Sequence, residues 1–176
     1  MKIKLIFAAL LMSVMGSAAA ATENNVKFNG TLVALPCTIP DSDRTIKVNM
    51  ATTNAHDLYL NQAMPRKTFT VHLEDCDPTI KDKISITFSG AEDAALPGYL
   101  ALDSGQSTAS GVAIGLESSS SEQIKVNQET SAYSILVGNN ELSFRAYIAG
   151  EPDAIRNRTI VVGSFSATAI ITLNYS

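Results

Sequence analysis

The sequence is poor in the residues from which catalytic and metal sites are built. Its 176 residues include no tryptophan, two histidines and two cysteines. It has no Cys-x-x-Cys pair, no Gly-x-Ser-x-Gly elbow and no glycine-rich phosphate loop. These absences argue against redox, hydrolase and nucleotide chemistry, so we expect no catalytic residue and no cofactor.

The two histidines, His56 and His72, do not form a convincing metal or general-base site. His72 lies near Glu74, Asp75 and Asp77, which could suggest a metal ligand set. However, His72 falls on the polar face of an expected strand, and the acidic residues belong to the turn that follows. We therefore predict a structural or solvated role for His72, and no metal.

Basic residues are few and scattered. There are 13 lysines and arginines against 17 acidic residues, and the formal net charge is −4. The chain lacks the basic patch that binds nucleic acid and the basic cluster that binds anionic lipid. We expect no nucleic-acid partner.

Only one long apolar run occurs, at the N-terminus. It covers residues 5–15, follows Lys2 and Lys4, and precedes a stretch of small residues. It is shorter than the roughly 20 residues that span a bilayer. The pattern predicts a secretory signal peptide over residues 1–20, cleaved after Ala20 or Ala21. No later segment is apolar enough to cross a membrane, so we expect export without membrane insertion.

Both cysteines, Cys37 and Cys76, lie in the part expected to be exported. An oxidising compartment favours one bond between them over two free thiols. That bond would close a loop of about 40 residues, which the chain-entropy model values at up to about 4 kcal/mol.

The mature chain shows alternation with a period of two rather than helical periodicity. Residues 67–73, 83–89 and 142–149 each place apolar side chains on one face and polar ones on the other. Turn residues separate these segments. They are Pro78, Ser89 with Gly90, Pro97 with Gly98, residues 138–140 and residues 150–152. With no convincing amphipathic helix and no linker, this predicts one all-β domain, a sandwich of short strands.

The two ends of the mature chain alternate as well. Residues 163–176 form the longest regular pattern, beyond the usual 5–6 residues of a strand, and we expect both edges of this strand to be paired. Its apolar face consists of Phe165, Ala167, Ala169, Ile171, Leu173 and Tyr175. The first mature segment also reads as a strand, and one of its faces consists of Val26, Phe28, Gly30, Leu32 and Ala34.

These features together resemble the subunits of chaperone–usher fimbriae, and among them the minor tip pilins of type 1 fimbriae. The resemblance rests on residues 28–39 (FNGTLVALPCTI), 73–77 (LEDCD) and 144–150 (FRAYIAG), and on the C-terminal segment, residues 163–176. As in that family, Tyr175 is penultimate and Gly163 is fourteenth from the C-terminus.

The resemblance implies an incomplete immunoglobulin-like β-sandwich that lacks its last strand and has an N-terminal donor-strand arm. The arm would be residues 21–35, merging into the first strand, and the pilin domain residues 36–176. A periplasmic chaperone would cover the groove beside residues 163–175, an outer-membrane usher would mediate assembly, and a neighbouring subunit's arm would then fill the groove by strand addition. Gly30 would face a neighbour's groove, although a bulge in the strand is an alternative explanation.

Two alternatives remain open from the sequence. A carbohydrate-binding adhesin module is one, although the chain has only five tyrosines for sugar stacking and no room for a separate lectin domain. The other concerns the position in the fibre: the short arm favours a minor or adaptor pilin at the cell-surface fimbrium, against a major or terminating subunit.

Overall fold

The structure is a computed structural model that describes residues 26–52 and 54–176. The predicted signal peptide and its cleavage site lie outside the described residues. Ala34–Ser176 form one compact unit, and residues 26–33 belong to a separate one. Within the described residues, no helix combines the length and the apolar character needed to span a bilayer.

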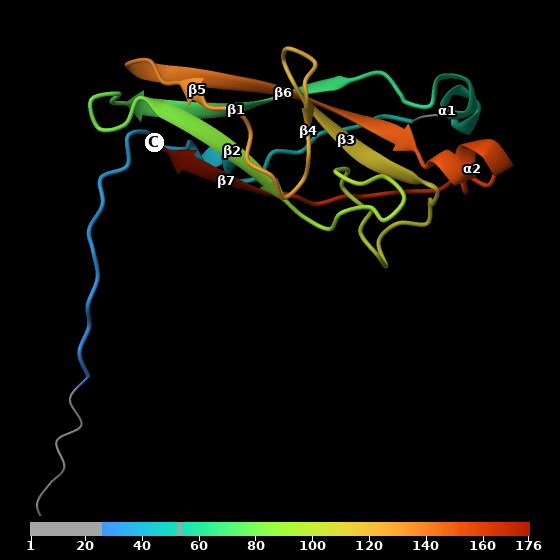
Figure 1. Cartoon of the computed structure of the whole chain (residues 1–176), viewed down its shortest axis with the longest axis horizontal. Coiled ribbons are helices and arrows are strands. Elements are labelled where there is room, and N and C mark those ends of the chain that lie inside the picture. Colours follow the sequence, from blue (N-terminus) through green and yellow to red (C-terminus); the bar gives the residue numbers. More distant parts are fainter. Residues whose placement is uncertain (1–25, 53) are drawn as a thin grey trace, which may run out of the picture. The chain divides into compact units, whose positions relative to one another are not determined.

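Two antiparallel sheets stack to form a sandwich (Figure 1). The four-stranded sheet has the order β1 (Lys67–Cys76), β6 (Gly138–Gly150), β3 (Val112–Ser118) and β4 (Gln123–Ile124). The three-stranded sheet has the order β5 (Tyr133–Ser134), β2 (Lys83–Ser89) and β7 (Ile170–Tyr175). The predicted all-β sandwich is therefore confirmed, and β7 lies at an edge.

The predicted strands over residues 67–73, 83–89 and 142–149 correspond to β1, β2 and β6. The turn predicted at residues 138–140 is wrong, because these residues begin β6. Gly138 pairs with Cys76 and Asn140 with Leu73, so β1 has one residue more than β6 between these two pairs, as in a β-bulge of β1. The turn-forming residues therefore lie in a strand, opposite this irregularity.

Strand β3 went unpredicted because it does not alternate. All seven of its residues are buried, including the polar Glu117 and Ser118, so no polar face alternates with an apolar face to reveal a period of two.

The expectation of no helices is also wrong. Two short helices occur at one end of the sandwich, α1 (Ala55–Asn61) and α2 (Pro152–Asn157), and a 3-10 turn covers Asp41–Arg44. The side chain of Asn54 caps α1 by accepting from the backbone N–H of His56 at 2.9 Å. Each helix buries a single residue, Leu58 or Ala154, so no apolar stripe marks it in the sequence.

Phe144 of β6 occupies the centre of the core and is fully buried. The rings of Phe69 and Phe88 lie 5.7 and 5.3 Å from it, and that of Tyr133 lies 6.1 Å away. The two sheets thus meet through a cluster of aromatic rings at the separations such pairs prefer.

A disulfide joins Cys37 to Cys76, as predicted. Thr38 and Glu74 exchange two backbone hydrogen bonds of 2.8 Å beside it, and the N–H of Asp77 donates to the carbonyl of Pro36. The covalent bond and this pairing fasten the start of the domain to the end of β1.

Removing this bond should reduce stability. We expect the Cys37→Ser, Cys76→Ser double variant to lose about 2–5 kcal/mol of unfolding free energy, measured by urea denaturation of the refolded chain. Either single variant should lose a similar amount and expose one thiol to labelling, since the same bond is absent. Two labelled cysteines in the denatured, non-reduced wild type would contradict the pairing.

Candidate functional site: an unpaired strand edge

The C-terminal segment uses one of its two edges to pair with β2. Lys83 and Ser176 exchange backbone hydrogen bonds of 3.0 and 3.3 Å, and the register runs from Ile84 opposite Tyr175 to Ser89 opposite Ile170. Hydrogen-bonded and non-hydrogen-bonded pairs alternate in an antiparallel ladder. The even-numbered residues of β7 therefore bond to β2.

Before Ile170 the same edge is bonded to a loop rather than to a strand. The carbonyl oxygens of Ser164 and Ser166 accept from the N–H groups of Thr108 and Asp103, both at 2.8 Å. Thr168 donates its N–H and its hydroxyl to the Asp103 carboxylate, at 3.2 and 2.9 Å. The strand predicted from Gly163 is thus regular only over β7, because before Ile170 an irregular loop, through its backbone N–H groups and the Asp103 carboxylate, takes the place of a partner strand.

The opposite edge is unpaired. Successive residues of a strand direct their backbone groups to opposite edges, so the odd-numbered residues from 163 to 175 face away from β2. None of them has a backbone hydrogen-bond partner within the described chain. The prediction that both edges of this C-terminal strand are paired is therefore correct for the edge that faces β2 and wrong for the opposite edge. At about 3.3 Å per residue, the free edge is about 40 Å long.

The core is incompletely covered along this edge. The inward-facing residues there are all half-buried and pack against the core, whereas Ile84 and Ile86 of the adjacent β2 are fully buried. Burial still raises the pKa of Tyr175 above its usual value. The half-buried residues are Phe165, Ala167, Ala169, Ile171, Leu173 and Tyr175, the set predicted from the sequence.

A second half-buried row was missed by the sequence analysis. Ile46, Val48 and Met50 alternate with exposed residues and pack against the same core. In the described structure, no backbone group of residues 45–50 has a hydrogen-bond partner. The signal was present, since the sequence Ile-Lys-Val-Asn-Met alternates with a period of two.

Gly163 lies where the loop approaches the chain most closely. A Cβ atom built there would be 2.9 Å from the backbone N of Ala109 and 2.9 Å from the carbonyl carbon of Thr108. Real Cβ contacts are essentially never this short, so glycine is required by the chain's own backbone.

The described part of the predicted arm, residues 26–35, forms no strand. Residues 26–35 are exposed and carry no assigned strand. Val26, Phe28 and Leu32 are 74%, 91% and 101% exposed, Ala34 is also exposed, and nothing lies within 4 Å of a Cβ built at Gly30. The large apolar side chains of this row are therefore exposed rather than part of a strand.

The other candidate residues have structural surroundings. His72 lies beside Asp43 with its Nδ1 2.8 Å from the carboxylate, and it does not contact the acidic turn that follows it in sequence. Among residues 26–52 and 54–176, no group of three or more His, Cys, Asp or Glu side chains could hold a metal ion.

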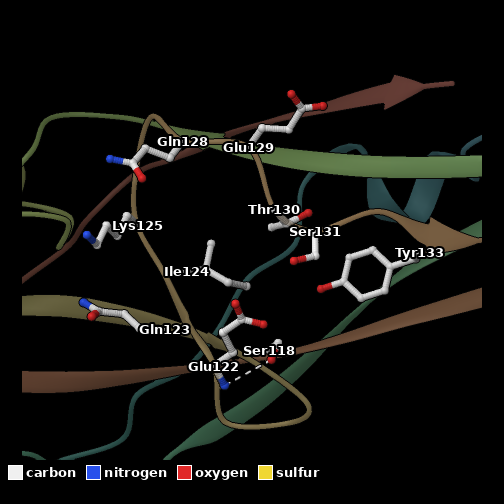
Figure 2. A pocket seen from close by; sticks show the side chains of 10 residues that line it. All are labelled: Ser118, Glu122, Gln123, Ile124, Lys125, Gln128, Glu129, Thr130, Ser131 and Tyr133. Carbon is white, nitrogen blue, oxygen red and sulfur yellow. Dashed lines mark hydrogen bonds between the residues drawn. The ribbon is translucent and has the colours of Figure 1, made fainter.

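Figure 2 shows a cavity of about 200 Å³ at β4 and the chain that follows it. Tyr133 is the single aromatic residue among the ten that line this cavity. Its ring packs edge-on against Phe144, and burial, with the nearby Glu122 charge, raises its pKa. A ring packed into the core in this way is poorly placed to stack on a sugar.

Comparison with known proteins defines the class to which this sandwich belongs. A family profile for fimbrial proteins matches residues 26–176, and the chain is therefore a member of the fimbrial protein family. The fimbrial adapter PapK of Escherichia coli is 33% identical over 172 residues, which cover 95% of this chain and 96% of PapK. The uncharacterized fimbrial-like protein YfcP of Escherichia coli K12 is 32% identical over 167 residues, covering 94% and 90%.

Solved structures agree on the fold. The P pilus rod subunit PapA superposes with a TM-score of 0.69 at 19% identity, covering 81% of this chain and all of that one. A chain of a chaperone–usher pilus gives a TM-score of 0.70 at 20% identity, covering 92% and 100%. The family match makes the chain a structural subunit of a cell-surface fimbria, as the resemblance implies, and the two pilus structures show the same sandwich fold.

Gly163 offers a direct test of the close approach. Gly163→Val should lose about 1–3 kcal/mol of unfolding free energy, because the backbone of residues 108 and 109 cannot move aside without strain. Gly30→Val, which meets no neighbour, should stay within about 0.5 kcal/mol of wild type. Urea denaturation of both variants measures the difference, and equal stabilities would rule out the crowding at Gly163.

Proposed function

We propose that this subunit accepts a β-strand from one neighbour along the free edge of residues 163–175, and donates residues 21–35 to another. The proposal is supported by two features that the same odd-numbered residues share. Within the described chain their backbone groups have no hydrogen-bond partners, and their apolar side chains are only half-buried. A single added strand would pair the backbone groups and cover the side chains.

Strand addition has suitable energetics for a lasting joint. Each new backbone hydrogen bond contributes about 0.5–1.5 kcal/mol net. The three large apolar residues of the arm, Val26, Phe28 and Leu32, would contribute about 1.5–3 kcal/mol each on burial, before entropic costs. Gly30 and Ala34 complete the row, and the small residue at 30 suits close contact with a groove.

Ile46, Val48 and Met50 support the same proposal from a second segment. Their backbone is unpaired and their inward side chains are half-buried, as on the β7 edge. An inserted strand would bond to residues 163–175 on one side and to residues 45–50 on the other.

An open edge about 40 Å long is an aggregation hazard until it is filled. A periplasmic chaperone that covers this edge would keep the subunit soluble, and an outer-membrane usher would exchange the chaperone for the next arm. These partners are inferred from the family.

We assign the chain to a minor or adaptor position in the fibre. Support comes from PapK, named a fimbrial adapter, and from the putative minor fimbrial subunit PmfF of Proteus mirabilis, 29% identical over 160 residues. An adaptor must both accept and donate a strand, whereas a subunit that ends the fibre needs only one of these functions. The two experiments below test the two functions separately.

Acceptance is tested at the C-terminal strand. Tyr175→Ala and Leu173→Ala remove inward-facing contacts with any docked strand, so less subunit should co-purify with the chaperone from the periplasm. Thr172→Ala, on the exposed face of β7, is the matched control and should co-purify like wild type. If all three variants are captured equally, the chaperone does not dock on this edge.

Donation is tested at the arm. Gly30→Arg would place a charge in the neighbour's apolar groove, where an unpaired ion is very costly. This variant should bind the chaperone normally but fail to join the preceding subunit in a purified strand-exchange reaction. Thr31→Arg, on the other face of the arm, should join normally. Normal joining by Gly30→Arg would contradict the proposed register, and loss of chaperone binding would mean that the arm is part of the subunit's own fold.

A further inference from the structure

Residues 45–50 lack the backbone bonds that normally hold a strand in place. Within the described chain, their backbone groups bond to no neighbour, yet Ile46, Val48 and Met50 keep a regular inward orientation. Something other than a ladder must set the position of this segment. Polar attachments occur just before it and at its end.

The attachment before the segment is Asp43. Its Oδ2 accepts two hydrogen bonds from His72 of β1, from the backbone N–H at 2.7 Å and from the ring Nδ1 at 2.8 Å. The Asp43 side chain is 9% exposed, whereas that of Asp41, two residues earlier in the same 3-10 turn, is 89% exposed. Asp43 therefore contacts the sheet, and Asp41 does not.

The geometry of β1 explains why Asp43 meets His72. Glu74 of β1 directs its backbone groups toward Thr38, away from β6, and His72, two residues earlier in β1, directs its N–H to the same edge. The incoming chain thus follows this edge of β1, first by backbone pairing at Thr38 and then through the carboxylate of Asp43. In the described structure, Asp43 is the last hydrogen-bonded attachment to β1 before residues 45–50.

Hydrogen bonds from His72 also favour the ionised form of Asp43. Burial would raise the pKa of this carboxyl, but the bonds from the backbone and ring of His72, with one from Ser42, outweigh it and lower the pKa. The group is ionised at neutral pH, and hydrogen bonds to a carboxylate are stronger than those between neutral groups.

The far end of the segment has its own local bond. The side chain of Asn49 accepts from the N–H of Ala51 at 2.9 Å, and Ala51 adopts a left-handed conformation with φ of 58°. The chain turns there. The segment is thus defined at its far end by a turn and before its start by the contact with β1.

We propose that Asp43 is a positioning residue for strand docking: bound to both donors of His72, it holds residues 45–50 as a preformed wall for the incoming strand. This inference rests on the proposed function. A wall that is ordered before docking removes an entropic cost from the docking step. Without the carboxylate, the segment would have to be ordered by the incoming strand itself.

The test measures docking on the full mature chain, refolded with its disulfide. The probe is a synthetic peptide of residues 26–35, labelled with a fluorophore, and the readouts are its association rate and Kd. We expect Asp43→Ala to weaken binding about tenfold, mainly through slower association, as expected for loss of preorganisation. Asp41→Ala is the matched control, with the same change in the same turn, and should stay within about twofold of wild type.

Two further variants separate positioning from general destabilisation. Asp43→Asn keeps an acceptor for the His72 N–H and should restore part of the affinity. His72→Ala removes the ring donor but not the backbone donor, so it should reduce the peptide affinity less than Asp43→Ala does. If Asp43→Ala does not refold, His72→Ala tests the same contact in its place.

A double-mutant cycle with Met50→Ala gives the decisive result. If Asp43 acts by placing the wall, Met50→Ala should weaken peptide binding clearly in wild type and much less in the Asp43→Ala background. Additive effects, or wild-type affinity in Asp43→Ala, would overturn the positioning role alone. Failure of the wild-type chain to bind the peptide would instead overturn the proposed acceptance of a strand with this arm's pattern along residues 163–175.

Discussion

The one-sided pairing of the C-terminal segment is the constraint on which the rest of this structure depends. Even-numbered residues bond to β2 and to the loop at residues 103–110, which leaves the odd-numbered residues without backbone partners in residues 26–52 and 54–176. In a strand, the parity that decides which edge a backbone group faces also decides which face the side chain occupies. The open edge and the half-covered core are therefore consequences of one register.

The remainder of the domain is organised so that this opening does not unfold it. Aromatic rings around Phe144 join the two sheets, and the Cys37–Cys76 disulfide secures the start of the domain to β1. Asp103 and its loop hold residues 164–168 on the paired side, so the free edge stays extended. This arrangement suits the proposed strand addition, in which the joint must be open before assembly and closed afterwards.

Strand β3 and the two helices escaped prediction from the sequence for one physical reason. Strand β3 is buried throughout, and helices α1 and α2 bury one residue each, so none of these elements shows a one-sided pattern. Residues 138–140 are turn-forming residues yet lie within β6, where they pair with β1 on both sides of a bulge between Leu73 and Cys76. Sequence periodicity reveals an element that buries one of its faces. It does not reveal a strand that is buried on both faces or a helix that buries a single residue.

The sequence alone determined the all-β class, the cysteine pair and the apolar face of residues 165–175, because each depends on local alternation or on residue type. Tertiary structure alone decided which edge of that strand is free. It also showed that Gly163 is crowded by residues 108 and 109, and that Asp43 reaches His72 across 29 positions of sequence. These features depend on contacts between segments far apart in the chain, and no local pattern encodes the direction in which a backbone group finds its partner.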